Sequence, residues 1–174
     1  ANIGGVVPNE GKVIASNNVA GVLVNGGSGT TIRGNSIHSN GGLGIDVVST
    51  GVTANDNCDA DTDANGRQNF PLIDSFTTFG GTTTVTGTLN SRPNATYTLD
   101  FYTSDVPDPS GYGEGKTWIG SQTVSTGANC SLTTSTFSLN VPAVPPTARF
   151  VTATATDSAG NTSEFSPAFG QTVT

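Results

Sequence analysis

Acidic and amide side chains are concentrated between positions 56 and 65, and this stretch offers the clearest chemistry in the chain. Residues 61–66 read D-T-D-A-N-G, which places hard oxygen donors at alternate positions and a glycine where the chain must turn sharply. This pattern matches the first half of the calcium-loop signature D-x-[DN]-x-[DN]-G. The sequence therefore predicts a calcium site, for which the candidate ligands are Asp56, Asn57, Asp59, Asp61, Asp63 and Asn65.

The second half of the calcium-loop signature is missing. Position twelve of this loop is Leu72, where a helix-loop-helix site has a bidentate Glu. An ion would have to take its remaining ligands from neighbouring acids or from carbonyl groups. The alternative is an acidic loop that is simply solvated, although densely packed carboxylates repel one another in a chain of net charge −7.

Two cysteines, Cys58 and Cys130, are the only thiols in the chain. Neither lies near a histidine in the sequence, so no zinc site or Cys-His nucleophile is indicated. If they pair, the disulfide would join the acidic loop to the C-terminal half and contribute about 4 kcal/mol, and it would imply an oxidising compartment. The alternative is two separate buried thiols, because the number of cysteines does not establish pairing.

The segment 105–118 combines aromatic residues, acids and glycines in a long connection between predicted strands. Long loops on β-sandwiches often carry binding sites. Tyr112 and Trp118 could present flat apolar faces to a sugar ring, while Asp108 and Glu114 could accept hydrogen bonds from its hydroxyl groups. The alternative is that Trp118 packs in the core and Tyr112 only fixes its own loop.

The residues that could support catalysis are few. His38 is the only histidine, and the spacing gives it no partner carboxylate, so a catalytic triad is not indicated. Glycoside hydrolysis could use Asp46 with a carboxylate of the acidic loop, and a lyase would need Arg33 or Arg67 as its base. We therefore expect no catalytic residues and keep a polysaccharide-degrading enzyme as the alternative.

The composition of the chain predicts an all-β protein. Its 174 residues include 23 glycines and nine prolines between short β-branched runs, and no stretch shows helical periodicity. No apolar run approaches the ~20 residues of a membrane span. Six scattered basic residues offer no patch for a nucleic acid.

An internal repeat predicts the architecture of the first part. Residues 11–24 align with residues 34–47, with a shift of 23 residues and six of fourteen positions identical. This period, without a helix, is typical of coils of a parallel β-helix. Asn17 and Asn40 would occupy equivalent corners, where left-handed backbone geometry and side-chain ladders are useful. The first coil would present an exposed edge through which the chain could associate. The predicted interior residues are Ile14, Val22, Val24, Ile32, Ile37, Ile45 and Val47.

The second part alternates apolar and polar residues with a period of two. Segment 69–73 looks like a bridge, and we place the domains at 1–75 (β-helix coils with the acidic loop) and 76–174. Six strands in the second domain predict a β-sandwich of immunoglobulin-like type. The predicted strands are 82–89, 95–103, 117–125, 132–141, 148–157 and 163–169.

Five motifs give the chain a resemblance to a known group of proteins. They are I-R-G-N-S-I-H-S-N-G-G-L-G-I-D at 32–46, Q-N-F-P at 68–71, G-T-L-N at 87–90, D-P-S-G-Y-G-E-G at 108–115 and T-A-T-A-T-D-S-A-G-N-T-S-E-F at 152–165. On these motifs the chain resembles the C-terminal region of secreted bacterial proteins with right-handed parallel β-helix repeats. The resemblance implies a short β-helix followed by a sandwich, in a secreted or cell-surface protein.

The sequence leaves three functions open. The first is a non-catalytic extracellular module, stabilised by calcium, that binds a polysaccharide or a cell-surface glycan. The second is a fragment of a β-helix polysaccharide lyase or glycoside hydrolase. The third is a passive structural stalk, because one fold hosts many unrelated functions.

Overall fold

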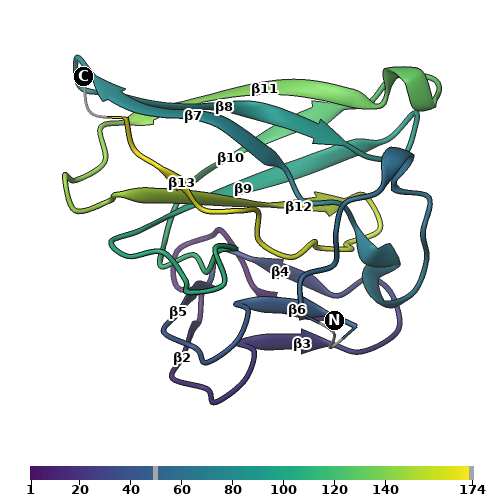
Figure 1. Ribbon diagram of the computed structural model, residues 1–174, viewed down its shortest axis with the longest axis horizontal. Coiled ribbons are helices and arrows are strands. Elements are labelled where there is room, and N and C mark those ends of the chain that lie inside the picture. The colour runs from purple at the N-terminus through teal and green to yellow at the C-terminus, as the bar shows by residue number, and fades with distance from the viewer. Residues whose placement is uncertain (49–50, 173–174) are drawn as a thin grey trace.

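The computed structural model describes residues 1–48 and 51–172, and its secondary structure is entirely β-strand and short 3₁₀ turns (Figure 1). The prediction of an all-β protein is confirmed. No helix in the described part of the chain is long and apolar enough to cross a membrane.

The N-terminal strands are three residues long and pair in parallel. The pairs are β1 (Asn2–Gly4) with β4 (Thr31–Arg33), β2 (Val13–Ala15) with β5 (Ser36–His38), and β3 (Val22–Val24) with β6 (Ile45–Val47). In the second and third pairs each residue lies opposite the residue 23 positions later, as Ile14↔Ile37 and Val22↔Ile45 do. The sequence repeat therefore sets the strand register of this part. We call residues 1–48 the parallel region.

The C-terminal strands form two antiparallel sheets. The upper sheet in Figure 1 has the order β11-β8-β7, and the lower sheet has the order β10-β9-β12-β13. The strands are β7 (Leu72–Phe79), β8 (Thr82–Asn90), β9 (Thr96–Ser104), β10 (Thr117–Ser125), β11 (Thr134–Pro142), β12 (Phe150–Asp157) and β13 (Phe169–Gly170).

The lower sheet is covered on both faces, because it lies between the upper sheet and the parallel region (Figure 1). Leu99 and Phe101 of β9 pack against Phe137 in the core between the two antiparallel sheets. From the opposite face of β9, Tyr102 packs with Ile32 and Ile37 of the parallel region in a second core. The molecule therefore has two hydrophobic cores on either side of one shared sheet.

The expected interior residues of the repeat occupy the second core. Val24, Ile32, Ile37, Ile45 and Val47 are buried there, while Ile14 and Val22 are partly buried and pack against them. The two corner asparagines also form a ladder, since Asn17 Nδ2 donates a hydrogen bond to Asn40 Oδ1 at 2.7 Å. The left-handed backbone geometry lies one residue earlier than expected, at Ser16 and Ser39.

Two strand boundaries differ from the expectations. Strand β7 begins at Leu72, inside the segment expected to be a bridge, because a bulge at Asp74 interrupts its alternation and hides the pattern. The expected strand 163–169 is reduced to β13. The segment before β13 runs beside β12, where the backbone N–H groups of Ala155 and Ala153 donate hydrogen bonds to the hydroxyl groups of Ser163 and Ser166, at 2.9 and 3.0 Å. Side chains therefore supply part of the pairing with β12.

Candidate functional site

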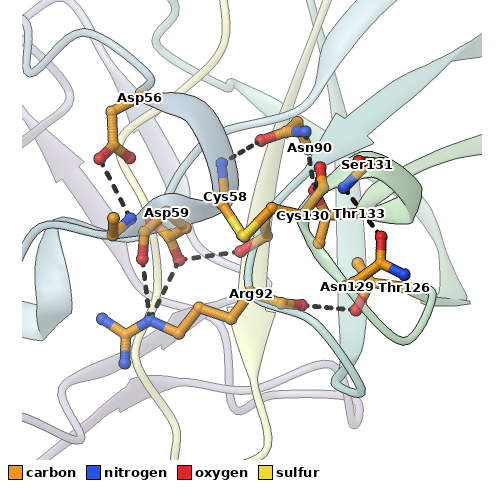
Figure 2. The surroundings of a disulfide bond; sticks show 12 residues. Asp56, Cys58, Asp59, Asn90, Arg92, Thr126, Asn129, Cys130, Ser131 and Thr133 are labelled. Carbon is orange, nitrogen blue, oxygen red and sulfur yellow. Dashed lines mark hydrogen bonds and ion pairs between the residues drawn. A yellow bond between two sulfur atoms is a disulfide. The ribbon is translucent and has the colours of Figure 1, made fainter.

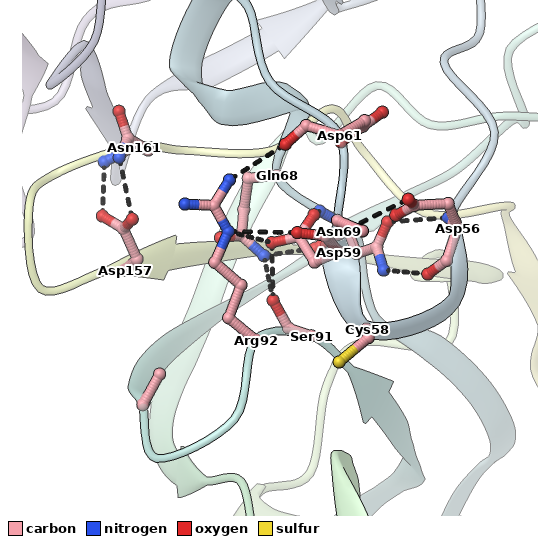
Figure 3. A network of polar contacts seen from close by, with 12 residues as sticks. Asp56, Cys58, Asp59, Asp61, Gln68, Asn69, Ser91, Arg92, Asp157 and Asn161 are labelled. Atoms are coloured by element: carbon pink, nitrogen blue, oxygen red, sulfur yellow. Dashed lines mark hydrogen bonds and ion pairs between the residues drawn. The ribbon is translucent and has the colours of Figure 1, made fainter. Parts of the chain in front are cut away.

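Three of the predicted ligands meet on the connection between β6 and β7. Asp56, Asp59 and Asp61 each place one carboxylate oxygen within 4.8 Å of the others. A 3₁₀ turn, η1 (Asn57–Asp59), brings Asp56 and Asp59 together, and Cys58 and Asp59 adopt positive φ angles of 69° and 51° inside it. Figure 3 shows these carboxylates gathered beside Asn69 and Arg92. We call the three residues the acidic cluster.

Asp59 is the fixed member of the acidic cluster. Its side chain is 1% exposed and accepts hydrogen bonds from the backbone N–H of Asn69 at 3.0 Å and from Ser91 Oγ at 2.8 Å. Burial raises the pKa of the Asp59 carboxyl to about 6, and these hydrogen bonds and the Arg92 charge offset only part of that effect. A carboxylate so deeply buried is stabilised by any cation placed beside it.

Asp56 and Asp61 carry the strongest sign of an absent partner. The Oδ1 atoms of both residues are buried and have no hydrogen-bond partner within the described structure. Burial and the neighbouring Asp56 charge raise the pKa of Asp61. Buried polar atoms normally have a partner, and carboxylate oxygens are the ligands that calcium prefers. The acidic cluster therefore fits a hard divalent cation.

Arg92 partly neutralises the acidic cluster from one side. Its Nε donates a hydrogen bond to the carbonyl oxygen of Asp59 at 3.0 Å, and its Nη2 donates one to the carbonyl oxygen of Asp61 at 3.1 Å. The same Nε lies 3.7 Å from a carboxylate oxygen of Asp59. Arg92 thus fixes the backbone of the loop, and its charge lowers the pKa of both Asp59 and Asp61.

The remaining predicted ligands are Asn57, Asp63 and Asn65. Asn57 is exposed, and Asp63 binds the backbone N–H of Ala64 and the guanidinium of Arg67. Asn65 is fully buried at the start of the turn η2 (Ala64–Arg67). Its Oδ1 accepts a hydrogen bond from Thr30 N, and its Nδ2 donates to Thr30 O and Thr162 O. Asp63 and Asn65 thus have partners outside the acidic cluster, and Asn65 joins the parallel region to the C-terminal segment. Asn57 lies in η1, between Asp56 and Asp59.

Cys58 and Cys130 form a disulfide, so of the two sequence alternatives the paired one is present (Figure 2). Cys58 lies between Asp56 and Asp59, and its backbone N–H donates a hydrogen bond to Asn90 Oδ1 at 2.7 Å. Cys130 lies in the turn η3 (Cys130–Leu132) before β11. The disulfide and Asn90 together anchor the acidic cluster to the end of the upper sheet.

Glu164 links the C-terminal segment to the parallel region. It is 3% exposed, and its two carboxylate oxygens accept hydrogen bonds from Val47 N at 2.8 Å and Thr53 N at 2.9 Å. Burial raises the pKa of Glu164 to about 7. The two backbone hydrogen bonds lower this pKa, and the nearby Asp46 charge raises it. The sequence analysis missed this residue, because a single Glu between Ser163 and Phe165 carries no pattern.

The four residues predicted to bind carbohydrate do not form one platform. Trp118 is partly buried against the second core, and its Nε1 donates a hydrogen bond to Asp100 at 3.0 Å. Tyr112 packs edge-on against Phe70, with ring centroids 5.7 Å apart. Both rings expected to face a sugar are therefore partly engaged in packing within the protein.

The two acids of that set do share a hollow. Asp108 and Glu114 line a space of about 340 Å³ together with His38 and Lys116. Glu114 Oε1 also accepts hydrogen bonds from the backbone N–H and the side chain of Asn40, at 3.0 and 2.7 Å. The polar half of the predicted carbohydrate site thus lies at the junction between the parallel region and the lower sheet.

Both arginines considered as a lyase base have carboxylate partners. Arg33 pairs with Asp100 and Arg67 pairs with Asp63. The hydrogen bond to Asp100 raises the pKa of Arg33, which opposes the loss of a proton that a lyase base requires. His38 Nδ1 lies 3.1 Å from Ser39 Oγ. Asp46 lines a hollow of about 430 Å³ to which the acidic cluster does not contribute.

No protein-family model matches this chain, and no curated protein matches it significantly. The resemblance to β-helix repeat proteins therefore stays a prediction.

Proposed function

We propose that this chain is a non-catalytic extracellular module that binds a polysaccharide or a cell-surface glycan and is stabilised by calcium. The observation that carries the stabilising ion is the pair of buried, unpartnered oxygens of Asp56 and Asp61 beside the buried Asp59. The observation that carries glycan binding is the polar hollow lined by Asp108, Glu114 and Lys116. The disulfide at Cys58 supports an extracellular location, because disulfides persist mainly in oxidising compartments.

Within this proposal the parallel region is the last two coils of a right-handed β-helix, and the two antiparallel sheets form an immunoglobulin-like sandwich. The 23-residue register and the Asn17–Asn40 ladder support the first assignment. The packing of two antiparallel sheets over one core supports the second. The sandwich would then cover the end of the β-helix through the lower sheet.

Calcium would be held by Asp56, Asp59 and Asp61, with water or carbonyl groups completing its shell. When bound, the ion would supply two positive charges to a cluster whose carboxylates are opposed only in part by the charges of Arg92 and Arg67. Cys58 ties this loop to η3, and Asn90 ties it to β8. The ion would therefore stabilise the connection between the two cores.

The hollow at the junction supports binding of a glycan. Its polar side chains, Asp108, Glu114 and Lys116, can exchange hydrogen bonds with hydroxyl groups. The partners found for Arg33 and Arg67 weigh against the enzyme alternative.

Thermal unfolding with and without calcium tests the stabilising ion. We expect millimolar Ca²⁺ to raise the melting temperature after treatment with EDTA, since a ligand at 100 times its Kd stabilises by about 2.7 kcal/mol. Asp61→Asn should remove most of this increase. Asp74→Asn, which neutralises an exposed carboxylate on β7, is the matched control and should keep it. An unchanged melting temperature in the wild-type protein would remove calcium from the proposal.

Pull-down on insoluble polysaccharides and a glycan array tests the binding function. Retention on at least one glycan is expected with Ca²⁺, and weaker retention with EDTA. No retention on any glycan would favour the passive stalk. Release of reducing sugars or unsaturated products from pectin, xylan or alginate would favour the enzyme alternative.

A further inference from the structure

Three hollows follow one another from the strands β9 and β10 of the lower sheet to the parallel region. The first, of about 360 Å³, lies beside β9 and β10 and shares Ser104, Asp105 and Lys116 with the second, of about 340 Å³. The second shares Asn40, Asp108 and Pro109 with the third, of about 430 Å³. Each is at the small end of the range for ligand pockets, so a ligand that fills all three must be extended.

The charges along these hollows are mainly negative. Asp105 and Lys116 line the first and second hollows, Glu114 lines the second, Asp108 lines the second and third, and Asp46 lines the third. Lys116 is the only Lys or Arg among the lining residues, and its ammonium already pairs with Asp105 at 3.1 Å. Three carboxylates, those of Asp46, Asp108 and Glu114, therefore have no cationic partner in the described structure.

Asp46 adds a sign of an unmet partner. Its Oδ1 is buried and has no hydrogen-bond partner within the described structure. Asp108 Oδ1 accepts hydrogen bonds from the backbone and side chain of Ser110, and Glu114 Oε1 accepts from Asn40. These bonds hold two of the carboxylates in place before a ligand arrives.

We propose that the three hollows act as one groove that binds an oligosaccharide bearing amino groups, such as a chain of glucosamine units. The inference rests on the proposed glycan-binding function and names the class of glycan. Ammonium groups would form charge-assisted hydrogen bonds with Asp46 and Asp108, and hydroxyl groups would bond to Ser104 and Ser110. A polyuronate would place carboxylates against carboxylates, so the groove excludes it.

The probe is a hexamer of glucosamine, compared with a neutral cellohexaose and with a hexamer of galacturonate, by isothermal titration calorimetry in Ca²⁺. We expect the glucosamine hexamer to bind most tightly, and raised salt to weaken its binding. Asp46→Asn and Asp108→Asn should each weaken it about tenfold, the size of one lost charge-assisted hydrogen bond. Asp108→Asn keeps an oxygen that can accept the hydrogen bonds from Ser110, and Asp74→Asn is the charge-matched control that should bind as the wild type does.

The outcomes separate this inference from the function on which it rests. Tighter binding of the neutral or uronate hexamer, or equal binding by the two groove variants and the wild type, would overturn the assignment of the groove while glycan binding itself stands. Failure of all three hexamers, with no retention on any polysaccharide, would overturn both. A lysine-rich peptide that binds with the same dependence on Asp46 and Asp108, when no glycan does, would identify the ligand as protein and overturn the inference. Melting temperatures of each variant distinguish lost binding from lost folding.

Discussion

Arg33 of the parallel region forms an ion pair with Asp100, which lies on β9 with a fully buried side chain. Arg33 Nη2 and Trp118 Nε1 both donate hydrogen bonds to Asp100 Oδ1, at 3.1 and 3.0 Å. One carboxylate therefore connects the parallel region with two strands of the lower sheet.

Replacing Arg33 with Ala should destabilise the protein strongly. The change leaves the Asp100 carboxylate buried without its cation, and breaking a buried pair in this way typically costs about 3 to 5 kcal/mol. Urea unfolding followed by fluorescence measures the difference. The comparison variant is Lys116→Ala, which breaks the exposed pair with Asp105 and should leave the unfolding midpoint nearly unchanged. Equal effects of the two variants would contradict the structural role of Asp100.

Reduction of the disulfide should lower stability by about 4 kcal/mol, because the bond links residues 72 positions apart and so restricts a long loop of the unfolded chain. The paired variant Cys58→Ser with Cys130→Ser gives the same comparison without a reductant. Denaturant unfolding in EDTA isolates this effect, and repeating it in Ca²⁺ shows whether the acidic cluster still binds the ion. Identical midpoints for the oxidised and reduced protein would exclude a stabilising role.

The free energy of unfolding should fall as the pH rises from about 4.5 to about 7, because Glu164 loses its proton in the folded protein over this range. Its pKa is about 7 in the folded chain against the ordinary value of 4.5, so the folded state binds more protons in this window. The stabilisation is fully present below the ordinary value, and up to about 3 kcal/mol is lost as the pH rises through the folded-state pKa.

Urea midpoints from pH 4 to pH 8 in EDTA measure this dependence. Glu164→Gln keeps an acceptor for Val47 N but cannot ionise, so its stability should decline less over the same range. Glu10→Gln, at an exposed position, should follow the wild type. If Glu164→Gln shows the wild-type slope, the titrating group is a different one.

Asn40→Ala should cost about 2 to 3 kcal/mol, because its buried amide accepts from Asn17 and donates to Glu114 and to the carbonyl oxygen of Ile14. Asn17→Ala removes only the outer member of the ladder, at an exposed position, and should cost about 1 kcal/mol. Thermal unfolding of the two variants checks the order. A larger effect at position 17 would show that the ladder does not depend on its inner member.

Much of the fold could be predicted from the sequence, because local patterns express it. The 23-residue repeat predicts which parallel strands pair, and the period-two pattern locates β8 to β12 to within two residues. The patterns fail where a bulge shifts the alternation, as at Asp74, and where hydroxyl groups replace part of the backbone pairing, as at Ser163 and Ser166.

The candidate site could be predicted only in part. Density of acids points to the loop that carries Asp56, Asp59 and Asp61, but spacing alone also selects Asn65, which the fold buries against Thr30 and Thr162. The partners of Arg33 and Glu164 lie 67 and more than 100 residues away in sequence, and no local pattern reports such distances. Asp100, which lies between the apolar residues Leu99 and Phe101, is the sequence feature that could indicate a buried ion pair.

The shared lower sheet has a consequence for attempts to divide the protein. A shortened chain that begins at residue 76 would lack the first part of β7 and would expose Tyr102, Trp118 and Phe165, which the parallel region covers. Such a fragment would expose a contiguous apolar surface, and the Asp100 carboxylate would lack its partner Arg33. We therefore expect the fragment to self-associate when it is expressed alone. The practical unit for cloning and for fusion to other proteins is the undivided chain.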